Sequence, residues 1–283
     1  MGQPLIIRTK LADIPMLRDR YPFLYLEHGR LEIDDSSVKW ISASGKHFRL
    51  PAAMICTLLL GPGTSVTHEA VKILASLNTT TCWVGDDSLI FYAVGNSPTA
   101  NTYNLKKQLQ LATDPEKSLG VARQMFAQRF PDVDIQNRNL KQLMTMEGQR
   151  VKASYIEYAE KYHVPWKGRS YVPGEFSFSD LTNQIITSVN SALYALVCSI
   201  LYSLGFDPRI GFVHSGSPLP FVYDVADLYK SYLVFDFAFY MTGRLGGRFQ
   251  RKKVLDEFKE RLLEMDFLKK CPQDVLKLMG VSK

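Results

Sequence analysis

The chain has 283 residues, of which 46% are hydrophobic and 22% are charged, and its formal net charge is +6. This length allows two domains or one large one, and the composition excludes a disordered, collagen-like or coiled-coil protein. The most apolar stretch, residues 191–206, is interrupted by Ser199 and Ser203 and is too short to cross a bilayer, so we expect no membrane span.

The first ten residues lack the basic segment, apolar block and cleavage site of a secretory signal, which predicts a cytoplasmic protein. The four cysteines agree with this prediction. They stand far apart in mostly apolar contexts and include no C-x-x-C pair for zinc or redox chemistry. We therefore expect buried thiols at Cys56, Cys82, Cys198 and Cys271.

From residue 21 to residue 94 the sequence has the short runs of a β-rich region. Turn-forming residues separate most of these runs, among them His28-Gly29 and the segment GPG at 61–63. One amphipathic helix interrupts them, because the apolar residues between 66 and 74 follow a helical spacing and Thr67 can cap its start. The predicted strands cover residues 23–27, 31–33, 38–41, 47–50, 54–60, 81–84 and 89–93.

After residue 95 the apolar period changes to 3.6 and remains there, which predicts helices. We place a linker at 95–100 and an irregular insertion, rich in Gly, Pro and aromatic residues, at 165–178. The predicted fold class is α+β, with a mainly β domain over residues 1–95 and a larger all-α domain over residues 96–283. The predicted helices cover residues 102–112, 115–130, 140–162, 180–204, 222–240, 248–267 and 272–279.

Several common catalytic motifs do not occur in the sequence. The segment 61–65 precedes a helix but lacks the Lys of a Walker loop and the third Gly of a dinucleotide loop. The segment VHSGS at 213–217 is not a G-x-S-x-G elbow, and no two histidines are spaced i, i+4 as in zincins. We therefore look to acidic residues for the chemistry.

Three acidic residues and one histidine stand where a helical core should be apolar. Glu147 lies mid-helix on an apolar stripe, so the helical period directs its carboxylate inward, where an unpaired charge is costly. Asp224 and Asp227 are three residues apart and share a helix face with Lys230. His214 lies in a Gly-bounded turn before this helix, and a loop could bring it back over the helix start.

A divalent cation would offset the cost of burying these acids. Oxygen ligands from Glu147 and Asp227, with the imidazole of His214 and several waters, suit Mg²⁺ or, better, Mn²⁺. Such a site can activate a nucleophile and stabilise a phosphoryl group. These residues therefore form a candidate catalytic metal site.

The alternative is that the same acids are structural. In that interpretation Asp224 caps a helix or forms a salt bridge and Asp227 pairs with Lys230, while Glu147 pairs with Arg150. Ion pairs of this kind are common in proteins without any catalytic role. Spacing alone leaves both interpretations open.

The segment 183–194 carries polar residues on one helical side and apolar residues on the other. Such a polar stripe can line a cleft, although exposure to solvent is its commoner cause. The polar side consists of Asn183, Gln184, Thr187, Asn190, Ser191 and Tyr194.

Positive charge is concentrated near the C-terminus. Residues 241–283 carry 11 Lys and Arg against 6 Asp and Glu, whereas the preceding residues are close to balance. A strip of this kind can neutralise nucleic-acid phosphates, and the alternative is a solvated helix face. Its densest part consists of Arg244, Arg248, Arg251, Lys252 and Lys253.

Three blocks of the sequence resemble the signature segments of the CRISPR-associated integrases, the Cas1 family, in its type I-E branch. They are TMEGQR at 145–150, GFVHSG at 211–216 and FVYDVAD at 221–227. The resemblance covers most of the chain, from YLEHG at 25–29 through LGPGT at 60–64 and WVG at 83–85 to the basic tail.

The resemblance implies an N-terminal β domain and a C-terminal helical domain. It implies a metal triad of Glu147, His214 and Asp227, with Asp224 as a supporting acid. It also implies a homodimer, two of which flank a Cas2 dimer, and an assembly that inserts short double-stranded DNA into a CRISPR array.

The implied reaction is attack by a 3′-hydroxyl of the incoming DNA on a phosphodiester at a repeat boundary. Lys230 would neutralise the phosphate, and the strip that includes Arg244, Arg248, Arg251 and Lys252 would hold the duplex backbone without reading bases. Attack by water would instead give nuclease activity.

Two positions depart from the pattern of some relatives. Met144 stands where these carry an Arg, so a phosphate contact is absent or comes from Arg138 or Arg150. His28 stands where these carry a Tyr that stacks at the duplex end. Imidazole can also stack on a base, and the alternative is an ordinary turn histidine.

Two other functions remain open at this stage. One is a non-catalytic DNA-binding assembly subunit with structural acids, and the other is a metal-dependent repair nuclease acting on branched DNA. Only the integrase joins DNA ends covalently, so product analysis separates it from the nuclease. For the assembly subunit, we expect Asp227→Ala and His214→Ala to unfold or to leave function unchanged.

Overall fold

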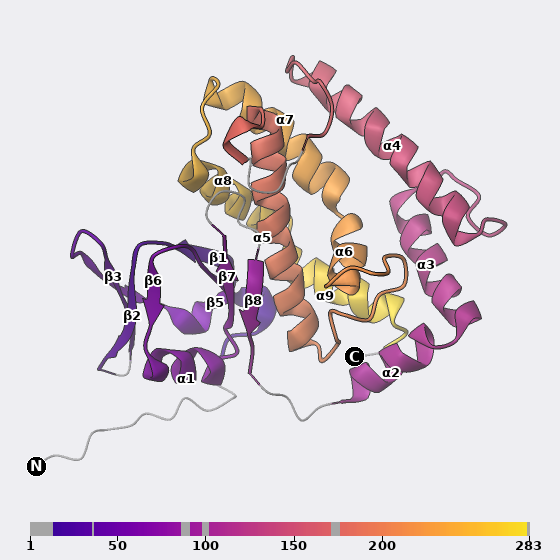
Figure 1. Ribbon diagram of the computed structural model, residues 1–283. Coiled ribbons are helices and arrows are strands. Elements are labelled where there is room, and N and C mark those ends of the chain that lie inside the picture. The colour runs from indigo at the N-terminus through magenta and orange to yellow at the C-terminus, as the bar shows by residue number, and fades with distance from the viewer. Residues whose placement is uncertain (1–13, 36, 86–90, 98–101, 171–175, 282–283) are drawn as a thin grey trace, which may run out of the picture.

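The computed structural model describes residues 14–35, 37–85, 91–97, 102–170 and 176–281. A strand-rich region occupies the N-terminal part and helices occupy the rest (Figure 1), which confirms the predicted α+β class. The described strands end at Gly95 and the following helices begin at Tyr103. Residues 1–10, for which we expect no secretory signal, lie outside the described residues, as do parts of the predicted strand 89–93, linker and insertion.

Two four-stranded sheets make up the described strand-rich region. The first has the order β1-β5-β7-β8, with β1, β5 and β7 parallel and β8 antiparallel. The sequence ICTLLL of β5 is buried throughout, as expected for a central parallel strand covered on both faces. The strands of this sheet are β1 (Tyr21–Leu26), β5 (Ile55–Leu60), β7 (Thr80–Val84) and β8 (Phe91–Gly95).

The second sheet has the order β4-β3-β2-β6 and shares a small core with helix α1 (His68–Ser76). Thr67 caps α1 as predicted, since its side chain accepts a hydrogen bond from the backbone N–H of Ala70. The sequence analysis missed β6, a strand of three residues. The strands are β2 (Gly29–Asp34), β3 (Ser37–Ser42), β4 (His47–Leu50) and β6 (Thr64–Val66), with 3₁₀ turns at Leu17–Asp19 and Ala52–Met54.

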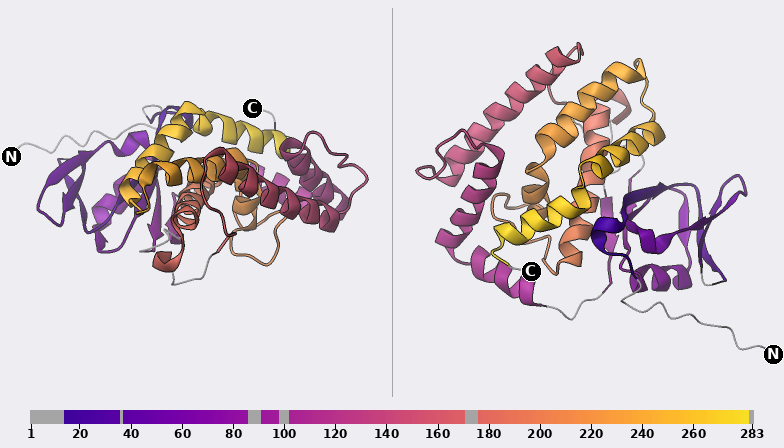
Figure 2. Two further views of the ribbon diagram at one scale, coloured as in Figure 1. Left: turned by 90° about the horizontal axis from the view of Figure 1, so that it is seen from above. Right: turned by 180° about the vertical axis from the view of Figure 1, so that it is seen from behind.

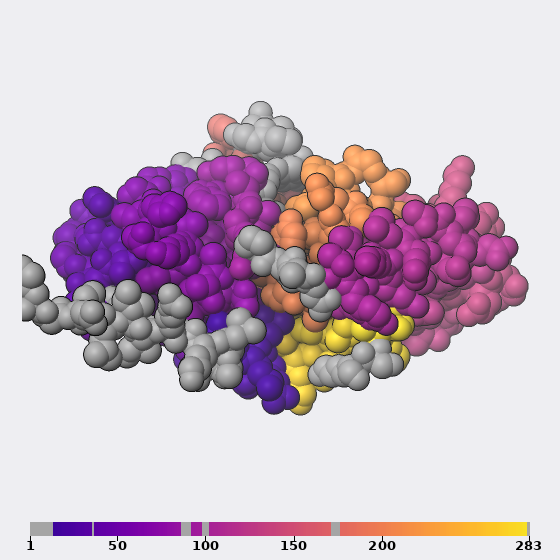
Figure 3. All heavy atoms as spheres, turned by 90° about the horizontal axis from the view of Figure 1, so that it is seen from below, coloured from indigo at the N-terminus to yellow at the C-terminus, as the bar shows by residue number. Residues whose placement is uncertain are grey.

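The helical region is built around α5, and α6 lies between α5 and the α3–α4 pair (Figures 1 and 2). From behind, α8 and α9 cross this region diagonally (Figure 2), and from below the C-terminal segment lies between the strands and α2–α3 (Figure 3). The helices are α2 (Tyr103–Ala112), α3 (Pro115–Arg129), α4 (Leu140–Lys161), α5 (Leu181–Ser203), α6 (Pro220–Asp227), α7 (Asp236–Leu245), α8 (Arg251–Glu264) and α9 (Phe267–Leu278), with a 3₁₀ turn at Phe176–Phe178.

The prediction of one continuous helix over residues 222–240 was wrong. Helix α6 ends at Asp227, a π-helical turn follows at Ser231–Phe235, and α7 begins at Asp236. A π-turn inserts extra chain into the helix, and a periodicity of 3.6 in the sequence does not reveal such an insertion. The prediction that the last helix begins at Pro272 was also wrong, because Pro272 lies inside α9.

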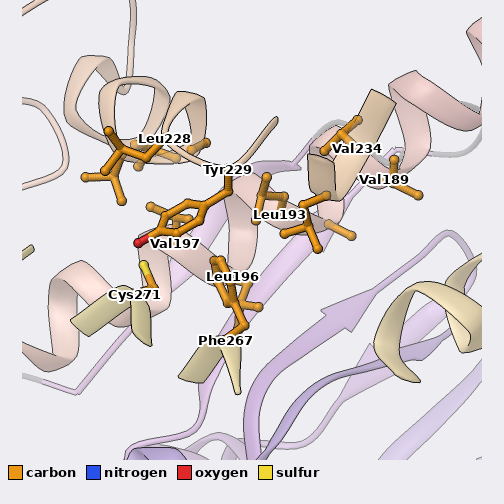
Figure 4. Close-up of a cluster of buried hydrophobic side chains, with 14 of the residues drawn as sticks. Val189, Leu193, Leu196, Val197, Leu228, Tyr229, Val234, Phe267 and Cys271 are labelled. Atoms are coloured by element: carbon orange, nitrogen blue, oxygen red, sulfur yellow. The ribbon is translucent and has the colours of Figure 1, made fainter. Parts of the chain in front are cut away.

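One hydrophobic core joins the first sheet to the helices. Cys82 and Val84 of β7 belong to the same buried cluster as α5, and Thr57 of β5 donates a hydrogen bond to Ser199 of α5 at 2.8 Å. In the helical part of the core, Tyr229 lies among aliphatic side chains with Cys271 and Phe267 beside it (Figure 4). The change from strands to helices falls at the predicted division near residue 95, while the assignment of the two parts as separate domains stays a prediction.

All four cysteines are buried and unpaired, as predicted. Helix α5 is long and apolar enough to cross a membrane, but 83% of its most apolar window is buried inside the structure. Burial of this kind is typical of a core helix, and the rest of the described chain contains no other helix that meets these criteria.

Asp236 ties three helices together. Its carboxylate accepts hydrogen bonds from Lys161 Nζ at 2.7 Å and the Tyr162 hydroxyl at 2.8 Å, both at the end of α4, and from Arg261 Nη2 of α8 at 2.7 Å. Burial raises the pKa of this carboxyl, but the three donors outweigh burial and hold the pKa below its ordinary value. Asp236 therefore contributes stability in its ionised form.

We expect Asp236→Asn to destabilise the protein by about 2 kcal/mol at pH 7, because its donors lose a charged acceptor. A carboxyl with a lowered folded-state pKa stabilises above its unfolded value of about 4 and loses this effect as the pH falls through the folded value. The difference between variant and wild type should therefore shrink below about pH 4. Denaturant unfolding at a series of pH values measures this, and an equal difference at every pH would contradict it.

Candidate active site

A cleft of about 890 Å³ lies where the end of α3, the middle of α4, α5 and the region after α6 meet. Tyr194 and Asn190 of α5 contribute to its wall, and the π-helical turn widens the backbone along one side. Two acidic residues predicted from the sequence face this cleft together with four basic ones. They are Glu147, Asp227, Arg129, Arg150, Arg169 and Lys230.

Glu147 reaches the cleft from α4. This helix begins with a capping box, in which Asn139 and Gln142 bond each other's backbone N–H groups, and this cap stabilises the helix start. The Glu147 side chain is 16% exposed, in agreement with the predicted inward direction. Its Oε1 accepts a hydrogen bond from Arg129 Nη2 at 2.6 Å. A partly buried cation–carboxylate pair therefore joins α3 to α4.

Asp224 organises the turn that carries His214. Its buried carboxylate accepts the backbone N–H groups of Phe212 at 2.6 Å, Val213 at 3.1 Å and His214 at 2.9 Å, and it contacts His214 Nδ1 at 2.8 Å. Gly211 allows this approach, because a Cβ there would lie 2.9 Å from Asp224 Oδ2. The turn thus returns over the start of α6, as the spacing suggested.

His214, Asp227 and Lys230 form a chain of contacts at the end of α6. Asp227 Oδ2 lies 3.7 Å from His214 Nε2, and Asp227 Oδ1 lies 2.5 Å from Lys230 Nζ. The hydrogen bond to Asp224 raises the pKa of His214 above its ordinary value. Asp224 therefore orients the imidazole so that Nε2 faces Asp227.

The charge balance at Asp227 is set by its neighbours. Burial raises the pKa of the Asp227 carboxyl, but Lys230, Arg129 and His214 outweigh burial and hold this pKa below its ordinary value. Burial lowers the pKa of Lys230, and Asp227 reverses that effect, so the Lys230 pKa is raised. Both residues are therefore charged at neutral pH.

The contacts expected from the structural alternative are partly present. Asp227 pairs with Lys230, and Asp224 satisfies a turn. The expected pair of Glu147 with Arg150 is not formed. Arg150 instead pairs with Asp132 at 2.5 Å, so that Glu147 is left to Arg129. Spacing of three residues along α4 was outweighed by partners from α3 and the loop after it.

The predicted ligands fit a divalent cation in kind, since two carboxylates face one cleft and an imidazole nitrogen lies beside one of them. Among the residues that the structure describes, however, no three His, Cys, Asp or Glu side chains form a group that could hold a metal ion. Glu147 is paired with Arg129 instead of converging on His214 and Asp227. Metal binding by this set stays a prediction.

Sequence reasoning missed the basic residues Arg129 and Arg169. An isolated Arg at a helix end or in an irregular segment carries no periodic signal. Arg169 donates to Asn183 Oδ1 at 2.7 Å and to Thr187 Oγ1 at 2.8 Å, and both acceptors are buried on α5. The commoner cause given for this polar stripe, exposure to solvent, is therefore wrong for these two residues, which are buried beneath Arg169.

The predicted DNA-binding residues lie on other surfaces. His28 is exposed in the turn between β1 and β2, with a left-handed φ of 52°. Arg248 and Lys252 are exposed near the start of α8. Arg251 turns toward β1, where its guanidinium lies 3.0 Å from Glu27 Oε2.

Arg244 is exposed at the end of α7. Its guanidinium donates a hydrogen bond to the Tyr240 hydroxyl at 2.8 Å and lies 3.6 Å from Glu257 Oε1. The sequence strip is thus not one continuous face, because Arg251 joins α8 to the strands while Arg244 has an acidic partner on α8.

Comparison with known proteins gives consistent matches. Residues 128–254 match the model of the family CRISPR associated protein Cas1. The chain is 52% identical over 281 residues, covering 99% of it and 95% of the relative, to the CRISPR-associated endonuclease Cas1 2 of Chlorobaculum tepidum. It is 36% identical to the CRISPR-associated endonuclease Cas1 of Escherichia coli K12, covering 86% of this chain and 79% of that one.

A solved structure agrees with this result. The crystal structure of a TtCas1–DNA complex superposes with a TM-score of 0.81, at 31% sequence identity and over 92% of both chains. The match thus extends over the strand-rich and helical parts alike.

Proposed function

The chain belongs to the Cas1 family of CRISPR-associated proteins, and from this we propose that it is a metal-dependent DNA endonuclease and integrase that inserts short foreign DNA into a CRISPR array. The cleft shared by Glu147 and Asp227, with the His214 imidazole beside Asp227, carries this proposal. We also assign the chain to the type I-E branch, on the sequence blocks at 145–150, 211–216 and 221–227.

The proposed reaction is attack by a 3′-hydroxyl on a phosphodiester at a repeat boundary. Glu147, His214 and Asp227 would hold Mg²⁺ or Mn²⁺, which supplies Lewis-acid stabilisation of the phosphoryl oxygens when it is bound. Asp224 keeps the His214 ring in place. Lys230 adds positive charge beside Asp227, where a developing negative charge on the phosphate is stabilised.

The basic side chains of the cleft favour a phosphate backbone as ligand. Arg150 and Arg169 line the cleft together with the Asp227–Lys230 pair. A guanidinium group can donate two parallel hydrogen bonds to two oxygens of one phosphate. Outside the cleft, Arg248 and Lys252 are exposed and would hold duplex DNA without reading its bases. The solved TtCas1–DNA complex supports DNA as the ligand, and we propose that this DNA is double-stranded.

The proposed assembly follows the family resemblance. Two copies of the chain form a homodimer, and two homodimers flank a Cas2 dimer in the cytoplasm. His28 stacks at the end of the duplex, since its turn leaves the imidazole exposed. Arg244, which is exposed, and Arg251 also contact the DNA backbone in this proposal.

The test is an assay for covalent joining. Labelled double-stranded DNA is incubated with the chain, purified Cas2, Mg²⁺ or Mn²⁺ and a plasmid that carries CRISPR repeats. We expect label in the plasmid at repeat boundaries and none in a matched plasmid without repeats. Cleavage of branched DNA without joining would point to a repair nuclease, and DNA binding without either product would point to an assembly subunit.

A further inference from the structure

Arg129 is the basic residue of the cleft that pairs with Glu147. It is the last residue of α3, and its guanidinium lies 2.6 Å from Glu147 Oε1, with the two side chains 11% and 16% exposed. The guanidinium carbon also lies 5.6 Å from the ring centre of Phe126 and 5.1 Å from that of Phe130. These aromatic contacts hold Arg129 against the Glu147 carboxylate.

The influence of Arg129 extends to the acid on α6. Burial raises the pKa of Asp227, whereas the positive charges of Lys230 and, after it, Arg129 lower this pKa. Asp227 is buried and Glu147 is partly buried, and both carboxylates need positive charge nearby, because an uncompensated charge removed from water is costly. Within the chain, Lys230 supplies this charge to Asp227 and Arg129 supplies it to Glu147.

A divalent cation that binds Glu147 and Asp227 meets the same two cations. Glu147 Oε1 already accepts a short, charge-assisted hydrogen bond from Arg129, and an ion bound to this carboxylate comes close to the positive guanidinium. Arg129 therefore shares the negative charge of Glu147 with the ion and repels the ion. We propose that Arg129 is an internal counter-ion that competes with the divalent cation for Glu147 and sets the metal concentration at which the site fills. This proposal rests on the metal site of the proposed function.

Titration calorimetry with Mn²⁺, in the absence of DNA, tests the competition directly. We expect Arg129→Gln to bind Mn²⁺ roughly tenfold more tightly than the wild type, because the competing charge is gone. Arg129→Lys keeps the charge and should stay closer to the wild type. The matched control is Arg150→Gln. It also removes one positive charge from the cleft, but Arg150 pairs with Asp132 and not with Glu147. We expect it to change the Mn²⁺ affinity by less than about threefold.

Thermal unfolding provides a second readout that does not depend on activity. Without Mn²⁺, Arg129→Gln should unfold at a lower temperature, because Glu147 has lost its partner. With Mn²⁺ added at one fixed concentration, its gain in Tm should exceed that of the wild type, since stabilisation by a ligand grows with concentration divided by Kd.

Unchanged or weaker Mn²⁺ binding by Arg129→Gln would overturn the proposal, because Arg129 would then support Glu147 as a ligand instead of competing for it. Glu147→Gln, introduced into the wild type and into Arg129→Gln, shows whether the measured Mn²⁺ binds at Glu147. If Mn²⁺ binds neither the wild type nor Arg129→Gln, or if Glu147→Gln leaves its affinity unchanged, the proposed metal site itself fails. Failure of the Arg129 proposal alone looks different: Mn²⁺ binding then depends on Glu147 but is not tightened by Arg129→Gln.

Discussion

Asp227→Asn is expected to lower the rate of DNA joining at least about a hundredfold, while the affinity for double-stranded DNA changes little. Asp227 is the residue that contacts both His214 and Lys230, and it lines the cleft with Glu147. The Asp227→Asn substitution removes a carboxylate ligand of the proposed Mg²⁺ or Mn²⁺ ion, whereas the basic residues that would hold DNA outside the cleft are unchanged. Gel-based joining assays and fluorescence anisotropy with the same labelled duplex measure the two quantities.

Stability has to be measured beside activity, because the variant leaves the Lys230 ammonium buried without its partner. Breaking such a pair costs about 3 to 5 kcal/mol. Asp236→Asn is the matched control, since Asp236 is equally buried and also paired with cations, but it joins α4, α7 and α8. We expect that control to lose stability and keep joining activity. Joining at the wild-type rate by Asp227→Asn would show that the acid is structural.

Asp224→Asn is expected to damage both the fold and the reaction. One carboxylate accepts three backbone N–H groups and the His214 ring, and an amide cannot replace it because its NH₂ group would face one of these donors. We expect a loss of about 3 kcal/mol, which lowers Tm by roughly 6 to 12 °C for a chain of this size. Differential scanning calorimetry measures this change.

The effect on the reaction follows from the position of His214. Without Asp224, the imidazole loses the hydrogen bond that directs Nε2 toward Asp227, so DNA joining should fall by roughly ten- to a hundredfold below the unfolding temperature. Asp256→Asn, which removes an exposed acid paired with Lys259, should change neither Tm nor activity appreciably. A stable, fully active Asp224→Asn protein would contradict the proposed role of this turn.

The sequence alone determined the local features of the site. A period of 3.6 located α4 within one residue at its C-terminal end and directed Glu147 inward. The three-residue spacing placed Asp224 and Asp227 on one face, with Lys230 next along the chain, and the glycines around His214 predicted a turn. Each of these inferences depends on residues within about two helical turns of one another, where backbone geometry fixes the outcome.

The break between α6 and α7 could not be predicted from the apolar pattern of the sequence. The apolar pattern continues through residues 222–240, yet the backbone forms a π-helical turn at Ser231–Phe235, and Ser231, Tyr232 and Phe235 of this turn line the cleft. Packing of Leu233, Val234 and Phe235 in the core accompanies this change. A buried side chain is compatible with either geometry, so the pattern does not distinguish them.

Tertiary structure alone decided which charges meet. Glu147 is bound by Arg129 from α3 instead of Arg150 from its own helix, and Arg251 turns from the basic strip to Glu27, directly after β1. The polar side of α5 is covered at Asn183 and Thr187 by Arg169. The physical reason is that periodicity fixes the face on which a side chain lies, whereas its partner depends on the packing of elements that are distant in the chain.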